Sequence, residues 1–282
     1  MKNIPNTIWI IWYQGYENAP EMVKHCIRSW EKHNPGYDVK LLDKNNLFDF
    51  IELPAKIDIN REDIPVQKIS ALSRLAILSK YGGVWADATV FCCRSLDEWL
   101  PEYLGRNFFA FRNPGPDRLM SNWFIVSDSE NIIIRTLYKE FSSFFIENSF
   151  TNLNKPFGRK AIKFLSSVLN TSVKSSLWWH SPLVTKILKV YPYYIFHYTF
   201  NKLILKNKAC RECWNSSKIF EADVPHTLQQ LVSNNDQNRI KKAVEHIENQ
   251  SSPVYKLNWR DNFENEYWKT VIELLNSQKQ TS

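Results

Sequence analysis

Apolar and polar positions follow two different periods in the first half of the chain, and this predicts strands separated by helices. The stretch TIWIIWYQG (7–15) is β-branched and aromatic and ends at a glycine, as is typical of a buried strand. After Pro20, apolar residues recur at helical spacing as far as the Asn-Pro-Gly stop at 34–36. YDVKLLD (37–43) has the pattern of a second strand. Strand, helix and strand in this order predict a βαβ unit, and hence a parallel sheet with a right-handed crossover.

The same pattern continues through the centre of the chain and becomes helical in the second half. VQKISALSRLAILSKYGG has the apolar spacing of a helix that ends at Gly82, and GGVWADATVF follows it as a strand. Further strands are expected at 107–113 and 121–128, and helices at 131–145, 157–169, 182–189, 236–249 and 265–278. We therefore predict an α/β sheet in residues 1–150 and a mostly helical half in residues 151–282, together forming one continuous globular unit.

Size and composition agree with a globular protein. The 282 residues are 44% hydrophobic and 23% charged, enough for one large domain or a domain with an appended lobe. No run approaches the roughly 18 apolar residues of a spanning helix, and the apolar stretch near the N-terminus is too short for a signal peptide. The five cysteines suggest no disulfide framework, and a lone C-x-x-C (210–213) lacks the second pair of ligands that zinc sites use. We expect a cytoplasmic protein.

The net charge of +7 is concentrated in one block. Residues 151–210 contain ten Lys or Arg, no Asp or Glu, and many interleaved aromatic residues. Such a block is typical of a surface that meets an anionic membrane or a nucleic acid, and it also fits aromatic core residues beside solvated lysines. Because the first half is not basic and no nucleic-acid-binding module is recognisable, we predict no nucleic-acid partner. Peripheral attachment at the inner face of the plasma membrane agrees with the block.

Asp87 follows an apolar strand that begins near Gly83. In open α/β sheets, ligands bind beyond the carboxyl ends of the strands, so this carboxylate is expected to face the ligand crevice. Mn²⁺ or Mg²⁺ takes oxygen ligands and is often shared between carboxylates and phosphates. Thr89, two residues further along, would point to the same side of a continuous strand and complete half of such a metal site. The alternative is a turn or capping role for Asp87.

The stretch ALSRLAILSKYGGVWADATVF, together with IPNTIWIIWYQG near the start, resembles the GT-A fold glycosyltransferases related to family 32. Within that group it resembles the capsular polysaccharide synthesis proteins, which share an Arg-bearing helix, a Tyr-Gly-Gly turn and an Asp-x-Asp or Asp-Ala-Thr strand end. Looser matches follow in SNWFIVSDSENIIIRTLYKEF, WWHSPLVTK, PYYIFHYTFNKLI and SPVYKLNWR, so the resemblance spans most of the chain. It implies metal-dependent transfer, with retention of configuration, from a nucleotide diphosphate sugar to a capsular or other cell-surface polysaccharide that is lipid-linked.

The resemblance also implies roles for residues of the central block. Asp87 would bind the donor diphosphate through the metal, and Arg74 would lie near the donor sugar or diphosphate, unless it forms only an ion pair on its helix. Thr89 stands where the broader family has a second Asp. Ala71 stands where many relatives have an acidic residue expected to hold the donor sugar, which leaves a binding protein without catalysis as an alternative function.

Four further residues are candidates for donor binding. Trp9 and Trp12 could stack on a nucleobase, because every base presents a π-face, or they could belong to the core. Gly82 and Gly83 belong to the predicted donor turn and also allow a left-handed helix end with close backbone packing.

Three residues of the second half complete the candidates. His197 could add a metal ligand from the second half of the chain, or it could be a hydrogen-bonded core residue. His180 and Trp179, in the segment WWHSP, could contact the acceptor.

Overall fold

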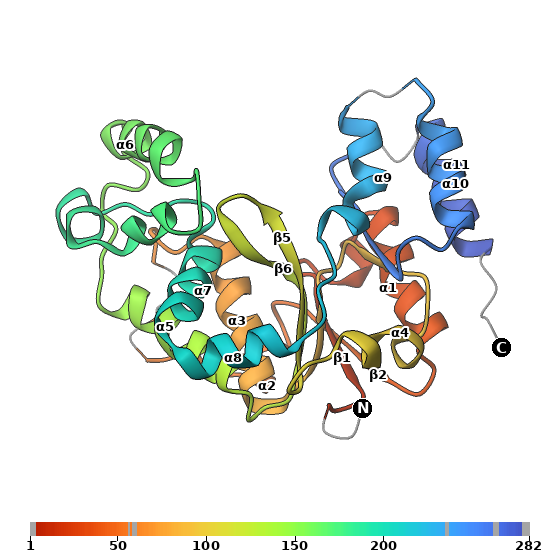
Figure 1. Ribbon diagram of the computed structural model, residues 1–282, viewed down its shortest axis with the longest axis horizontal. Coiled ribbons are helices and arrows are strands. Elements are labelled where there is room, and N and C mark those ends of the chain that lie inside the picture. Colours follow the sequence, from red (N-terminus) through yellow and green to blue (C-terminus); the bar gives the residue numbers. More distant parts are fainter. Residues whose placement is uncertain (1–3, 56, 58–60, 235–236, 262–264, 278–282) are drawn as a thin grey trace.

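The computed structural model describes residues 4–55, 57, 61–234, 237–261 and 265–277, and its centre is a five-stranded sheet (Figure 1). The strands lie in the order β2 (Asp38–Leu42), β1 (Thr7–Ile11), β3 (Gly83–Ala86), β6 (Arg118–Ser127) and β5 (Phe108–Gly115). β1 is parallel to β2 and β3, which confirms the βαβ unit. β6 is antiparallel to β3 and β5, so the prediction of a parallel sheet is corrected to a mixed one.

Helices cover both faces of this sheet, because its strands alternate side chains between two cores (Figure 1). In β3, Trp85 points to one core while Val84 and Ala86 point to the other. The first core is closed by α3 (Val66–Tyr81), α5 (Ile132–Ile146) and α7 (Ile195–Lys206). The second is closed by α1 (Glu21–His33) and α4 (Leu96–Tyr103).

The strand predicted over 82–91 divides at Asp87. β3 ends at Ala86, and in the turn that follows the Val90 N–H donates to the Asp87 carbonyl over 2.9 Å. β4 (Val90–Cys92) then leaves the main sheet and pairs antiparallel with β7 (Val254–Lys256). The expectation that Thr89 continues the strand of Asp87 is therefore wrong, and a segment from late in the sequence lies beside this turn.

The second half is helical apart from β7. The expected helices are found at α6 (Pro156–Leu169), α10 (Arg239–Glu248) and α11 (Glu266–Ser277), and the segment at 182–189 forms a π-helical turn, η3 (Leu183–Leu188). Elements not predicted are η1 (Tyr16–Asn18), α2 (Leu47–Phe50), η2 (Ser175–His180), α8 (Lys208–Ser216) and α9 (Asp223–Ser233), besides α4, α7 and β7. The division into two regions near residue 150 stays a prediction.

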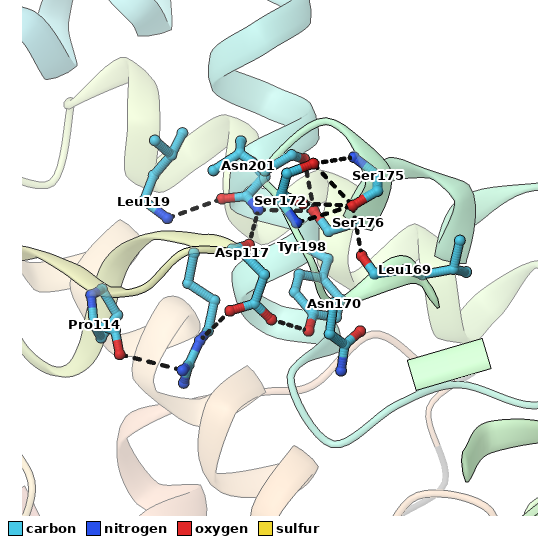
Figure 2. Close-up of polar contacts among 12 residues, drawn as sticks. Pro114, Asp117, Leu119, Leu169, Asn170, Ser172, Ser175, Ser176, Tyr198 and Asn201 are labelled. Atoms are coloured by element: carbon cyan, nitrogen blue, oxygen red, sulfur yellow. Dashed lines mark hydrogen bonds and ion pairs between the residues drawn. The ribbon is translucent and has the colours of Figure 1, made fainter. Parts of the chain in front are cut away.

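The turn between β5 and β6 is fixed to α7 by a buried polar network (Figure 2). The Asp117 carboxylate accepts hydrogen bonds from the Tyr198 hydroxyl and from Arg118 Nε. Asn201 donates to the Asp117 carbonyl over 2.7 Å and accepts from the Leu119 N–H over 3.1 Å. Because both partners of each bond are buried or half-buried, the hairpin and α7 are expected to keep one relative position.

Candidate active site

Asp87 and Arg74 form an ion pair at the carboxyl end of β3. Asp87 Oδ1 accepts a hydrogen bond from Arg74 Nη2 over 2.7 Å and another from Trp85 Nε1 over 3.0 Å. The Asp87 N–H donates to the Trp123 carbonyl over 2.8 Å, which fixes the backbone. The Asp87 side chain is 29% exposed and that of Arg74 only 5%, so the carboxylate reaches accessible space above a buried guanidinium.

The buried guanidinium retains unused hydrogen-bonding capacity. Its Cζ lies 4.9 Å from the centre of the Trp85 ring and 5.8 Å from that of Phe196, so aromatic faces cover much of it. Arg74 Nε and Nη1 are buried without a hydrogen-bond partner among the described residues. An unpaired buried donor costs about 1–3 kcal/mol. These two atoms are therefore expected to bond to water or to a ligand.

Lys256 approaches Asp87 from the other side. In the β4–β7 pair it lies opposite Val90, and its Nζ lies 3.9 Å from Asp87 Oδ2 and donates to the Thr89 hydroxyl. The Leu257 N–H donates to the Thr89 carbonyl over 2.8 Å, which fixes the backbone beside it. Burial lowers the pKa of Lys256, and the Asp87 carboxylate opposes this shift.

Two cavities meet at Asp87. The first has a volume of about 400 Å³ and the second about 530 Å³. Trp12 and Trp259 form one wall of the first, with their ring centres 5.6 Å apart, whereas His197 and Arg118 line the second. Ala71 also lines the second cavity, so the position for which the resemblance implied an acidic residue in relatives faces the site. The residues common to both cavities are Gln67, Asp87, Asn122, Tyr193 and Lys256.

Of the two candidate stacking residues, the structure brings only Trp12 to the site. Trp9 is 4% exposed, donates to the Gly82 carbonyl over 2.9 Å and packs against Phe50 and Tyr81. The prediction that Trp9 binds the donor is therefore corrected to a role in the core. Trp12 lies just beyond the end of β1 and lines the first cavity.

Gly82 and Gly83 lie at the opposite end of β3 from Asp87, about 13–17 Å away at 3.3 Å per residue. Their φ angles are +67° and +101°, and a Cβ on Gly83 would lie 2.6 Å from the Thr7 carbonyl oxygen. They form the tight connection from α3 to the sheet. Their predicted donor contact is corrected to this structural role.

The three candidate residues from the second half of the chain do not lie in one site. His197 is 8% exposed and lines the second cavity with Asp87, and its Nδ1 has no hydrogen-bond partner among the described residues. Burial, with Arg118 and Lys68 nearby, holds its pKa well below the ordinary value, so the imidazole is neutral.

Trp179 is fully buried and donates to Asn170, which makes it a core residue instead of an acceptor contact. His180 lines another cavity, beside Lys174, Lys202 and Lys206, so its acceptor role stays a prediction.

Two of the three predicted metal ligands, Asp87 and Thr89, do not fit a divalent cation in this arrangement. Asp87 lies between Arg74 and Lys256, and the Thr89 hydroxyl already accepts from Lys256. In the part of the chain that the structure describes, no group of three or more His, Cys, Asp or Glu side chains could hold a metal ion. A cation here would meet two like charges and one carboxylate.

Sequence reasoning missed the residues that the C-terminal segment brings to this site. Lys256, Trp259 and Arg260 line the first cavity, although they follow Asp87 by more than half the chain. The only signal was the resemblance of SPVYKLNWR to a later block of the family, which gave no role to any residue in it.

The segments that form the two sides of this site both match a known protein family. Residues 1–153 and 184–275 match the model of the capsular polysaccharide synthesis protein family. The chain is 31% identical over 147 residues to the O-glycosyltransferase braB of Annulohypoxylon truncatum, covering 45% of this chain and 35% of that protein. It is 26% identical over 164 residues to the uncharacterized glycosyltransferase L373 of Acanthamoeba polyphaga mimivirus, covering 57% of this chain and 63% of that protein.

The chain thus spans less than two thirds of the length of these relatives. A solved structure, the PaToxG glycosyltransferase, is similar over 76% of this chain and 78% of its own, with 15% identity and a TM-score of 0.36. The family model covers most of the chain and includes Arg74, Asp87, His197 and Lys256, and the chain therefore belongs to the capsular polysaccharide synthesis protein family.

Proposed function

We propose that the protein is a glycosyltransferase that moves a hexosyl group from a nucleotide diphosphate sugar to a hydroxyl of a capsular or other cell-surface polysaccharide. The observation that carries the proposal is the Asp87–Arg74 pair, at a strand's carboxyl end where two cavities meet. Family membership and the names of the relatives support it. A GT-A arrangement of the sheet is part of the same proposal.

The first cavity suits the nucleotide of the donor. Trp12 and Trp259 offer aromatic faces for a base, and the Trp12 Nε1 is buried without a partner among the described residues. Arg74, Lys256 and Arg260 bring positive charge for the diphosphate. The sugar would then lie near the residues that the cavities share, with the acceptor in the second.

In the transfer step, the bond between the sugar C1 and the diphosphate oxygen breaks, and its electron pair stays on that oxygen. The acceptor oxygen bonds to C1, and its proton passes to the released diphosphate. With retention, the acceptor approaches from the side on which the diphosphate leaves. The cations beside Asp87 would stabilise the negative charge that develops on the leaving group.

The donor-binding proposal predicts that one nucleotide raises the unfolding midpoint of the protein. Nucleoside diphosphates and nucleotide sugars are compared in a thermal-shift experiment, each with Mn²⁺, with Mg²⁺ and with EDTA. At a hundredfold excess over its Kd, a ligand stabilises the native state by about 2.7 kcal/mol. Because stacking contributes about 1–3 kcal/mol per base, Trp259→Ala should weaken binding by roughly 5- to 150-fold.

The matched control is Trp178→Ala. Trp178 is 66% exposed and does not line either cavity beside Asp87. That variant should bind like the wild type. No shift with any nucleotide would contradict the proposed function.

Ala71 favours a second candidate function, a relative that binds the donor without transferring it. This residue is 4% exposed and lines the second cavity, and the resemblance implies an acidic residue at its position in many relatives. Such a protein would show the thermal shift but release no nucleoside diphosphate from a nucleotide sugar. Measured release in the presence of acceptor distinguishes the two candidates.

We also propose that the basic block of residues 151–210 attaches the protein peripherally to an anionic membrane, at the inner face of the plasma membrane, where a lipid-linked acceptor would be found. No helix in the described ranges is long and apolar enough to cross a membrane. The block contains α6, which lies at one end of the molecule (Figure 1). It exposes large apolar side chains that line neither cavity beside Asp87: Phe157, Phe164, Val168, Trp178, Leu183 and Ile187. Apolar insertion combined with ten cations and no acid is the chemistry of such attachment.

This attachment predicts flotation with vesicles of phosphatidylcholine and phosphatidylglycerol, and much less with phosphatidylcholine alone. Burying each large apolar side chain contributes about 1.5–3 kcal/mol. The double variant Phe164→Ser, Ile187→Ser should therefore bind at least about tenfold more weakly. Ile219→Ser is the control, since Ile219 is 55% exposed outside the block. Equal flotation with neutral and anionic vesicles would exclude the proposed attachment.

A further inference from the structure

The charges around Asp87 do not balance within the protein. Among the described residues, those with charged side chains that line the first cavity are Arg74, Asp87, Lys256 and Arg260, a surplus of two positive charges. This surplus equals the charge of the two phosphates of a donor diphosphate. Arg74 is buried, Lys256 is largely buried and Arg260 is exposed. Because two such buried cations face a single carboxylate, which is unfavourable, the cavity is arranged to receive an anion.

Lys256 can meet such an anion from either cavity. Its ammonium lies at the junction of the two cavities, 3.9 Å from Asp87 Oδ2, and donates to the Thr89 hydroxyl. Its side chain is 18% exposed, so the charge is little screened by water yet can still be reached from the cavity. An ammonium has three donors, and those not used by Thr89 remain for phosphate oxygens.

Arg74 supplies a second set of donors at the same place. Its Nη2 bonds to Asp87, and its Nε and Nη1 are buried without partners among the described residues. A divalent cation bound to Asp87 and Thr89 would have to displace the Lys256 ammonium from both. The protein's own cation thus occupies the position that a bridging metal would need.

We propose that Lys256, together with Arg74, binds and neutralises the donor diphosphate in place of a divalent cation, so that donor binding needs no metal. This rests on the proposed function and specifies how the same site holds its donor. In the transfer step Lys256 would stabilise the charge left on the diphosphate oxygen when its bond to the sugar C1 breaks. It forms no covalent bond and keeps its proton.

The first test is nucleotide binding by isothermal titration calorimetry on the wild-type protein, with UDP, GDP and dTDP in EDTA, in Mg²⁺ and in Mn²⁺. We expect one nucleotide to bind in EDTA with a Kd within about threefold of its value in Mn²⁺. Binding that appears only with a metal overturns the inference and leaves the proposed function intact. Binding of none of the nucleotides, under any condition, overturns both.

The second test compares Lys256→Met with Lys40→Met in EDTA. Methionine keeps the length of the side chain and removes the charge, and Lys40 forms a surface pair with Asp38 without lining either cavity. Lys256→Met should weaken nucleotide binding at least tenfold, whereas Lys40→Met should not change it. Unfolding midpoints of both variants confirm that they fold. If a folded Lys256→Met binds the nucleotide as tightly as the wild type, Lys256 does not have this role; the wild-type metal comparison decides the matter if the variant is unfolded.

Discussion

Asp87→Asn is expected to lower the rate constant of sugar transfer by about a hundredfold or more. Asp87 is the only acidic residue, among those described, that lines both cavities. In the proposed function its carboxylate would lie beside the positive charge that develops on the sugar as the bond to the diphosphate breaks. It also orients Arg74 through the 2.7 Å hydrogen bond. Loss of one preorganised electrostatic partner lowers turnover by about 10²- to 10³-fold.

The same substitution distinguishes two roles of the carboxylate. If Arg74 and Lys256 hold the diphosphate, Asp87→Asn should leave nucleotide affinity in EDTA nearly unchanged, so that kcat falls without a matching rise in KM. Asp38→Asn is the control, because Asp38 is 57% exposed and pairs only at the surface with Lys40. Initial rates of nucleoside diphosphate release measure both parameters. Turnover above a tenth of the wild-type value would mean that Asp87 is not central to the reaction.

Gly83→Ala should have the largest effect on folding. The φ angle of Gly83 is +101°, and an added Cβ would lie 2.6 Å from the Thr7 carbonyl oxygen and 3.2 Å from Trp9 Nε1. Both neighbours belong to β1, next to β3 in the sheet, and have little freedom to move. Backbone strain of about 1–2 kcal/mol and overpacking of about 1–3 kcal/mol together predict a loss of about 2–5 kcal/mol in the free energy of unfolding.

Urea denaturation followed by far-UV circular dichroism measures this loss. Gly36→Ala is the matched control, because nothing lies within 4 Å of the Cβ it would add and its φ is not positive. Its unfolding free energy should change by less than about 0.5 kcal/mol. Equal midpoints for the two alanine variants would show that the connection from α3 to β3 tolerates a side chain.

The sequence predicted the elements whose pattern is local. α3 and the first βαβ unit follow from apolar spacing, and Asp87 was expected at a strand end because an apolar run precedes it. The break after Ala86 was not visible, because the residues on both sides of Asp87 are equally apolar. Strand β7 has three residues, too few to show a period, and its place depends on pairing with β4.

The same limit applies to the site. Trp9 and Trp12 look alike in the sequence, and only the position of β1 between two helical layers decides that Trp9 is buried. In the sequence, Lys256 looks like any other lysine of a basic chain, because only the long-range pairing of β4 with β7 brings it to Asp87. Local patterns therefore identified one side of the site, and tertiary contacts supplied the other.

The pairing of β4 with β7 has a consequence for the biosynthesis of the protein. Lys256 and Thr89, which share a hydrogen bond, are separated by 167 positions in the chain. At about 5–20 residues per second, a ribosome needs roughly 10–30 s to reach Lys256 after it has added Thr89. During that interval the emerging chain contains Arg74 and Asp87 without the lysine that completes their surroundings. If the proposed function holds, growing chains on a polysome would not transfer sugar, and turnover would begin only after β7 has been synthesised and has paired with β4.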